Sequence, residues 1–521
     1  MSNVDIYDTT LRDGSQGEGV NFTAQDKLRI AQRLDQFGVA FVEGGWPGSN
    51  PKDAEFFERA RDVEWTTAKI AAFGSTRRSN VVPEEDPNLR ALVDSGAPVC
   101  TIFGKSWAFQ VTEVLRTTLD KNLAMIEESV AFLVSHGRRV IYDAEHFFDG
   151  YRNDADYAVA TLLAAKRGGA ETLVLCDTNG GSLPWQIETA VTEVTRKVDH
   201  PLGIHTHDDT GCAVANALAA VRAGARQVQG TINGVGERCG NANLSIIIPN
   251  LELKLGMSAL PPGRLEDLTE VSRFVAEVAN LGVASGMAYV GRSAFAHKGG
   301  VHVAAMRRHV DSYQHADPAL VGNESRVVVS DLSGRGNVLA KAEELGLAVA
   351  DGEELLALEE IKNAEARGLS YEGAEASVSL LLRRRQAGYQ APFSILDYQV
   401  MVGKRQGASF VEATVRLEVA GQVVHTAGDG NGPVSALDSA LRKALGTHYP
   451  ALSGIHLADY KVRILDSNSG TGAVTRVLID SRDEQGSWST VGASANIIDA
   501  SMAALADSME YGLTRNHGAK A

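Results

Sequence analysis

The sequence predicts an α/β fold: a (β/α)₈ barrel, then a helical linker region, then a duplicated α+β domain. From residue 4 to about 255, short runs rich in β-branched residues alternate with longer amphipathic segments, as parallel strands alternate with crossover helices. Eight such units in about 250 residues match the size of a TIM barrel. A strand-and-helix pattern that occurs twice after residue 386 predicts the last domain. On pattern alone, a doubly wound open sheet is the alternative to the barrel.

Each strand of the predicted barrel is a short apolar run. The eight candidates are VDIYDTT from residue 4, VAFVEGG from 39, AKIAAFG from 68, PVCTIFG from 98, RRVIYDAE from 138, ETLVLCDT from 171, PLGIHTHDD from 201 and RQVQGTING from 226. The segments between them are predicted helices. In TAQDKLRIAQRLDQFG, for example, Ile30, Leu34 and Phe37 are spaced i, i+4 and i+7 and so share one helical face.

The chain of 521 residues is longer than one hydrophobic core normally organises, so two or three domains are expected. We place the barrel at residues 1–270, the helical linker at 271–385 and the duplicated domain at 386–521. The linker contains charged helical segments such as DGEELLALEEIKNAEARG, interrupted by FAHKGGVHVAAM.

The last domain contains an internal repeat. HTAGDGNGPVSALDSALRKAL, from His425, parallels STVGASANIIDASMAALADSM, from Ser489, and Thr426 and Thr490 are equivalent at an offset of 490 − 426 = 64 residues. The loop GDGNGP has no following Lys-Ser/Thr, so we interpret it as a turn and helix start, not as a phosphate cradle.

Composition limits the partners and the compartment. The net charge of −15 excludes nucleic acid and anionic membrane as bulk partners, so an anionic substrate needs a local positive site. No signal peptide begins the chain, and no apolar stretch reaches roughly 18 residues. The four cysteines form no C-x-x-C pair, which argues against a disulfide framework and favours a reducing cytoplasm. They are Cys100, Cys176, Cys212 and Cys239.

The strand ends of the predicted barrel are polar, and functional residues of such barrels lie at the carboxyl ends of the strands. His205 and His207 are two apart on a strand, so both side chains project from one face, either as hydrogen-bonded core histidines or as metal ligands. Asp13, at another strand end, adds a carboxylate. Two histidines and one carboxylate suit Zn²⁺, Mn²⁺ or a related divalent ion.

Three further polar residues have two interpretations each. Arg12 either forms a surface ion pair with Asp13 or grips a substrate carboxylate with its planar fork. Glu43 is either salt-bridged or a supporting residue behind the metal site. Asn241, in GVGERCGNANL after the eighth strand, either caps the next helix or lies near a ligand.

At this point DTTLRDG, HTHDD and GERCGN, in that order, resemble the acyl-CoA-condensing metal-dependent barrels that include 2-isopropylmalate, citramalate and homocitrate synthases. AFAHKGGVHVAAM, DSYQHADPALVGN and SDLSGRGNV look like the helical linker of those synthases, and the repeated domain resembles their amino-acid-sensing regulatory domain. The resemblance spans nearly the whole chain. It implies an enzyme that transfers the acetyl group of acetyl-CoA to a 2-oxo acid and hydrolyses the thioester.

The resemblance also assigns roles to residues. It places a divalent cation (Mn, Mg or Zn) on four of them: Asp13, His205, His207 and Asn241. It implies that Arg12 and Thr178 position the 2-oxo acid, and that Glu145 and His302, aided by Tyr313, serve proton abstraction from acetyl-CoA. His297 could compete with His302, but the GGVH segment around His302 matches the family pattern better.

The 2-oxo acid is less firmly indicated. VEGGWPGSNPKD after the second strand and YDAEHFFDG at the fifth look most like the citramalate synthase branch, which uses pyruvate and feeds isoleucine biosynthesis. A 2-isopropylmalate or homocitrate synthase is the enzymatic alternative, and a metabolite-binding sensor is the non-enzymatic one. We predict that Phe147 and Phe148 either narrow the acyl pocket or pack the loop. The resemblance further implies a homodimer, with isoleucine as the logical effector.

Overall fold

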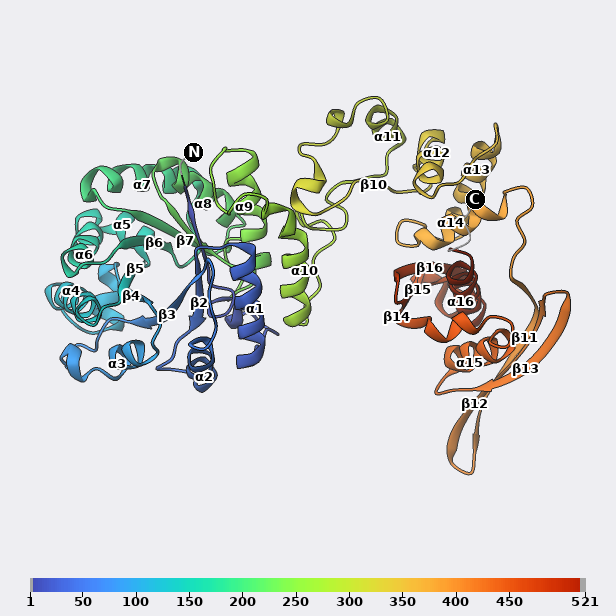
Figure 1. Ribbon diagram of the computed structural model, residues 1–521, viewed down its shortest axis with the longest axis horizontal. Coiled ribbons are helices and arrows are strands. Elements are labelled where there is room, and N and C mark those ends of the chain that lie inside the picture. Colours follow the sequence, from blue (N-terminus) through green and yellow to red (C-terminus); the bar gives the residue numbers. More distant parts are fainter. Residues whose placement is uncertain (1–2, 516–521) are drawn as a thin grey trace. The chain divides into compact units, whose positions relative to one another are not determined.

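The computed structural model describes residues 3–515, which form two compact units (Figure 1). One unit comprises the chain up to Phe295 together with Ala316–Glu324. The other comprises Ala296–His315 and the chain from Ser325 onward. None of the helices among residues 3–515 is both long enough and apolar enough to cross a membrane.

The first unit contains a closed barrel of eight parallel strands in sequence order, in which β1 pairs with both β2 and β8. All eight predicted strands are present, so the barrel is confirmed and the open-sheet alternative is wrong. The strands are β1 (Asp5–Asp8), β2 (Phe41–Gly45), β3 (Lys69–Ser75), β4 (Val99–Lys105), β5 (Arg139–Glu145), β6 (Thr172–Asp177), β7 (Leu202–Thr206) and β8 (Gln227–Gly230).

Helices follow the strands and cover the outside of the barrel (Figure 1). They are α1 (Ala24–Phe37), α2 (Pro51–Ala60), α3 (Pro87–Asp94), α4 (Leu119–Ser135), α5 (Phe147–Asn153), α6 (Ala155–Gly168), α7 (Pro184–Val198), α8 (Ala213–Ala223), α9 (Leu244–Leu253) and α10 (Leu268–Val278). The first of them shows why the segments are helical. Thr23 and Asp26 form a capping box at its start, Gly38 ends it with a φ of 99°, and the predicted apolar face is buried.

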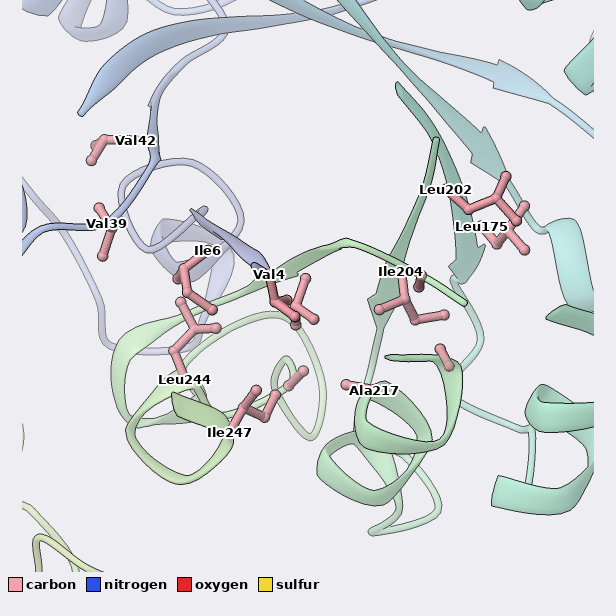
Figure 2. Close-up of a cluster of buried hydrophobic side chains, with 14 of the residues drawn as sticks. Val4, Ile6, Val39, Val42, Leu175, Leu202, Ile204, Ala217, Leu244 and Ile247 are labelled. Atoms are coloured by element: carbon pink, nitrogen blue, oxygen red, sulfur yellow. The ribbon is translucent and has the colours of Figure 1, made fainter. Parts of the chain in front are cut away.

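The core of the barrel unit has two layers, because successive residues of a strand point to opposite faces. Figure 2 shows the outer layer, where Ile6 of β1 and Ile204 of β7 lie among Ala217 of α8 and Leu244 and Ile247 of α9. The inner layer is a separate cluster inside the barrel, made of Tyr7, Phe41, Ala71, Val99, Ile141, Val174 and Cys176. The same alternation turns His205 inward, beside the outward-facing Ile204.

The second unit begins with the helical segment predicted as a linker. Its elements are β9 (Ala296–His297), α11 (Gly300–Met306), β10 (Arg326–Val327), α12 (Arg335–Glu344), α13 (Glu353–Ala366) and α14 (Glu375–Arg384). The last three helices share a core that includes Val338, Ile361 and Leu381, and Val491 of the final domain joins it.

The predicted repeat is confirmed as two three-stranded antiparallel sheets, each followed by a helix. The first copy is β11 (Phe393–Arg405), β12 (Ala408–Val419), β13 (Gln422–Asp429) and α15 (Pro433–Leu445). The second is β14 (His456–Ile464), β15 (Thr475–Asp483), β16 (Gly486–Ser494) and α16 (Ile497–Thr514). The GDGNGP loop leads into α15, whose first residue is Pro433, as the turn interpretation requires.

The equivalent residues of the repeat make equivalent contacts. The hydroxyl of Thr426 donates to the carbonyl of Ala440 at 2.9 Å, and that of Thr490 donates to Ala504 at 2.7 Å. A Cβ at Gly428 would lie 2.4 Å from the Ala440 nitrogen, so this position accepts only glycine. Close packing of the helix on the last strand is therefore what the repeated sequence preserves.

Candidate active site

A cavity of about 220 Å³ lies among residues at the carboxyl ends of the barrel strands. Six of the residues predicted from the sequence line it: Arg12, Asp13, Glu145, Thr178, His205 and His207. They come from the ends of β5 and β7 and from the segments that follow β1, β6 and β7, so barrel closure brings together residues that are far apart in the chain.

Asp13, His205 and His207 form a compact, buried cluster in this cavity. Oδ2 of Asp13 is 3.5 Å from Nε2 of His205 and 3.8 Å from Nε2 of His207, and the two Nε2 atoms are 3.3 Å apart. Burial lowers the pKa of His205 to about 3 and also lowers that of His207, so both rings are neutral near pH 7. Three potential ligand atoms therefore face one another in the form in which they bind metal.

The charge on Asp13 suits a cation. Burial by itself would raise its pKa, but Arg12 and the two histidines outweigh burial and lower it to about 2, with a further contribution from a hydrogen bond to Asn241. Oδ1 of Asp13 and Oδ1 of Asn241 are buried without a hydrogen-bond partner. Buried oxygens are rarely left unpaired, and a divalent ion would satisfy both. The residues present therefore fit a divalent metal ion.

The turn after β1 positions Arg12 and Asp13. Asp8, fully buried at the strand end, accepts hydrogen bonds from the backbone nitrogen and the hydroxyl of Thr10 at 2.9 and 2.8 Å. The carbonyl of Thr9 then accepts from the nitrogens of Arg12 and Gly14. This hydrogen-bonded turn directs the two functional side chains into the cavity.

Arg12 is not in a surface ion pair. Its Nε donates to Glu43 Oε2 at 2.6 Å, its Nη1 donates to Asp13 Oδ2 at 3.0 Å, and its guanidinium lies 3.7 Å from the ring centroid of Phe73. Glu43 is fully buried and also accepts hydrogen bonds from the hydroxyls of Tyr7 and Thr9. Of the two interpretations of Glu43, the salt bridge is the one observed. Burial alone would lower the pKa of Arg12, but the two carboxylates raise it.

Glu145 ends β5 and forms an ion pair with Lys105, its register partner at the end of β4. The hydroxyl of Thr178 accepts a hydrogen bond from the backbone nitrogen of His146 at 2.8 Å, which ties the end of β6 to that of β5. Sequence reasoning missed Lys105, although its place at the end of a predicted strand was a usable signal.

Aromatic rings form one wall of the cavity, and they are not the ones proposed from the sequence. Trp46, Phe73 and Phe103 line it, with Trp46 packed edge-on at 5.8 Å against each of the other two rings. Phe147 and Phe148 are buried in the core of the barrel unit and do not line the cavity. Of the two alternatives for these residues, packing of the loop is the one that their burial favours.

The loop after β8 brings Asn241 to the cluster. Its backbone forms a β-bridge with His207, and its side chain is buried beside Asp13. The helix cap expected here is Asn243 instead, whose side chain accepts from the nitrogen of Ser245 at 2.9 Å. Arg238, at the rim, donates to Asp209 and to the carbonyl of Thr178, which fixes this loop to the ends of β6 and β7.

His302 and Tyr313 belong to the second unit. Their rings stack with centroids 4.1 Å apart, and both side chains are exposed. The structure thus brings these two predicted residues together with each other. His297, the alternative to His302 for the same role, is partly buried. Burial is the main cause that lowers its pKa, and the nearby His302 lowers it further.

Comparison with known proteins agrees with this site. The HMGL-like family model matches residues 3–275, the homocitrate synthase post-HMGL domain-like model matches 289–368, and the LeuA allosteric (dimerisation) domain matches 372–513. An (R)-citramalate synthase from Geobacter sulfurreducens is 52% identical over 520 residues, which cover 99% of this chain and 98% of the relative. The chain belongs to the (R)-citramalate synthase family.

A second member of the (R)-citramalate synthase family, from Aquifex aeolicus, is also 52% identical, over 98% of each chain. A probable 2-isopropylmalate synthase from Methanopyrus kandleri is only 31% identical over 96% of each chain. The resemblance to the citramalate synthase branch is thus confirmed across both units of the fold.

Proposed function

We propose that this protein condenses acetyl-CoA with pyruvate and hydrolyses the thioester, giving citramalate and CoA. The observation that carries the proposal is that one cavity is lined by an arginine, a two-histidine, one-carboxylate cluster and a further carboxylate, Glu145. The arginine and the two-histidine, one-carboxylate cluster suit a 2-oxo acid, and Glu145 suits the removal of a proton from a thioester methyl group. Enzymes of this family use a divalent metal ion and acetyl-CoA.

Arg12 binds the carboxylate of pyruvate. It supplies the positive charge that an anionic substrate requires on a protein with a net charge of −15. Glu43 and the Phe73 ring hold its guanidinium in place, so little conformational entropy is lost when the substrate binds. Thr178 lies across the same cavity and assists in positioning the acid.

Asp13, His205 and His207, with Asn241 beside them, would hold the divalent cation. Bound there, the ion would polarise the ketone of the 2-oxo acid and stabilise negative charge on its oxygen.

Glu145 is the base. Its carboxylate takes a proton from the methyl group of acetyl-CoA, and the resulting enolate carbon forms a bond with the ketone carbon of pyruvate. The ketone oxygen gains the electron pair of its π bond and then a proton. Water next cleaves the thioester, and the leaving thiolate takes up a proton to give free CoA. We assign His302 and Tyr313 to proton transfer in these steps.

The aromatic wall favours pyruvate over larger acids. Trp46 is held against Phe73 and Phe103 by a hydrogen bond from its indole nitrogen to Asn88 at 2.7 Å, so it does not move aside easily. A rigid aromatic wall penalises each added methylene group by about 1–3 kcal/mol.

The remaining predictions concern organisation. We propose a barrel at residues 1–270, a linker at 271–385 and a regulatory domain at 386–521, in a homodimer located in the cytoplasm and inhibited by isoleucine. The match of residues 372–513 to an allosteric and dimerisation domain supports the regulatory domain and the homodimer. Unchanged activity and thermal stability of the full chain in saturating isoleucine would exclude this effector.

The test of the reaction is thiol release from acetyl-CoA by the purified full chain with Mn²⁺ or Mg²⁺. Pyruvate, 2-oxobutyrate, 2-oxoisovalerate and 2-oxoglutarate are compared at equal concentration. Preference for pyruvate is expected. Preference for 2-oxoisovalerate would make the protein a 2-isopropylmalate synthase with the same machinery, and no release with any acid would favour a non-catalytic sensor.

A further inference from the structure

A buried glutamine connects the metal-ligand cluster to the opposite wall of the barrel. Gln229 is fully buried on β8, in register with His205 on the neighbouring β7. Its side-chain Oε1 lies 3.1 Å from Nδ1 of His205, and its Nε2 donates to Oδ1 of Asp143 at 2.9 Å. Asp143, on β5, is itself buried and lines the cavity. The three side chains therefore form one hydrogen-bonded line across the barrel.

The structure gives the direction of the hydrogen bond at each end of this line. The NH₂ group of Gln229 faces Asp143 and donates to its Oδ1. The carbonyl end then faces His205, and because a carbonyl only accepts, Nδ1 of His205 must carry the proton. A neutral imidazole with its proton on Nδ1 has its lone pair on Nε2. That is the atom which lies 3.5 Å from Asp13 Oδ2 and 3.3 Å from Nε2 of His207.

We infer that Gln229, oriented by Asp143, is a positioning residue that fixes the tautomer and ring orientation of His205 for divalent-cation binding. Metal-binding histidines usually donate their second ring N–H to a carboxylate or a backbone carbonyl, and loss of that partner typically weakens metal affinity. Here the partner is a neutral amide, and the carboxyl group of Asp143 acts one step further away. The inference rests on the metal-ligand roles proposed above for Asp13, His205 and His207.

The test measures Mn²⁺ binding to the full chain by isothermal titration calorimetry after removal of metal with EDTA. Gln229→Leu is expected to raise the Mn²⁺ dissociation constant by roughly 10- to 100-fold, since His205 loses its fixed partner. The double variant Gln229→Glu/Asp143→Asn exchanges the carboxyl and the amide group along the line. The introduced glutamate accepts a hydrogen bond from His205 Nδ1, and the introduced asparagine donates one to that glutamate. This pair is expected to regain most of the affinity that Gln229→Leu loses.

Gln227→Leu is the matched control. Gln227 lies two residues earlier on the same strand, so it faces the same side, and it is buried with its Oε1 unpaired. It has no hydrogen bond to either histidine among those found for residues 3–515. Gln227→Leu is therefore expected to keep the wild-type affinity. An equal loss in this variant would overturn the inference, because the effect would then be a general distortion of the barrel.

Two further outcomes separate this inference from the proposed metal site. If His205→Ala binds Mn²⁺ as the wild type does, the metal-ligand assignment itself fails. If His205→Ala loses Mn²⁺ but Gln229→Leu retains it, only the role of Gln229 is overturned. Should Gln229→Leu not fold by circular dichroism, the comparison of Gln229→Glu alone with the double variant decides. In Gln229→Glu alone, the introduced carboxyl group lies against that of Asp143. This single variant is expected to bind Mn²⁺ more weakly than the double variant, and equal binding would overturn the inference.

Discussion

The substitution Arg12→Met would reveal how strongly the cavity depends on one buried ion pair. In the wild type, Glu43 is fully buried and receives hydrogen bonds from Tyr7, Thr9 and Arg12. Methionine retains much of the apolar contact with Phe73 but removes the charge, so two neutral hydroxyl donors alone must stabilise the carboxylate.

The magnitude follows from that imbalance. Removing one partner of a buried ion pair typically costs about 3–5 kcal/mol, because the other charge is left uncompensated. The double variant Arg12→Met/Glu43→Gln removes the charge of Glu43 and, like Arg12→Met, leaves Asp13 without its Arg12 partner, so it is expected to be more stable than Arg12→Met near pH 7.5.

The assay is urea unfolding of the full chain at pH 7.5, followed by tryptophan fluorescence and circular dichroism. Both variants should lose thiol release, since neither can bind the substrate carboxylate, so stability and activity are separated. The reasoning is refuted if Arg12→Met costs less than about 1 kcal/mol at pH 7.5, or if adding Glu43→Gln recovers none of the loss.

Three other expectations concern stability, specificity and chemistry. Asp35 accepts hydrogen bonds from the backbone of Thr66, Thr67 and Ala68, which lower its pKa although burial raises it. Asp35→Ala should therefore lower the free energy of unfolding in urea by about 2 kcal/mol. This difference from the wild type should fade as the pH drops through the lowered pKa. Trp46→Ala should raise the kcat/KM ratio of 2-oxobutyrate to pyruvate by about tenfold or more, whereas Phe147→Ala should leave it unchanged; the opposite pattern would restore the pocket role of Phe147. Glu145→Gln should reduce thiol release by about 10²- to 10⁴-fold while Mn²⁺ affinity is kept, and substantial turnover would remove Glu145 as the base.

The cluster of Asp13, His205 and His207 could be predicted from the sequence because it depends on two simple rules. Alternation along a strand places His205 and His207 on one face, and barrel closure brings Asp13, in the turn after β1, close to both histidines. Neither rule requires knowledge of side-chain packing. The repeat was equally accessible, since the glycines of the strand-helix contact recur at a fixed offset.

Unlike Lys105, the aromatic wall that sequence reasoning missed depends on contacts that no local pattern encodes. Trp46 lines the cavity because its loop is anchored. Asp53, which is paired with the buried Lys27, accepts a hydrogen bond from the backbone nitrogen of Trp46. Phe147 stays out of this cavity for the converse reason. His146 adopts a φ of 57°, so the chain reverses just before α5 and turns the Phe147 ring into the core. Nothing in the letters HFFDG indicates this reversal.

The most direct test of the central claim is to identify the product formed from ¹³C-labelled pyruvate, acetyl-CoA and Mn²⁺ by NMR and mass spectrometry, with Asp13→Asn as the control. We predict labelled citramalate in a one-to-one ratio with free CoA from the wild type, and none from the control. Two results would contradict the assignment of pyruvate to this cavity. One is that 2-oxoisovalerate is converted while no citramalate forms from pyruvate, and the other is that acetyl-CoA is not consumed at all.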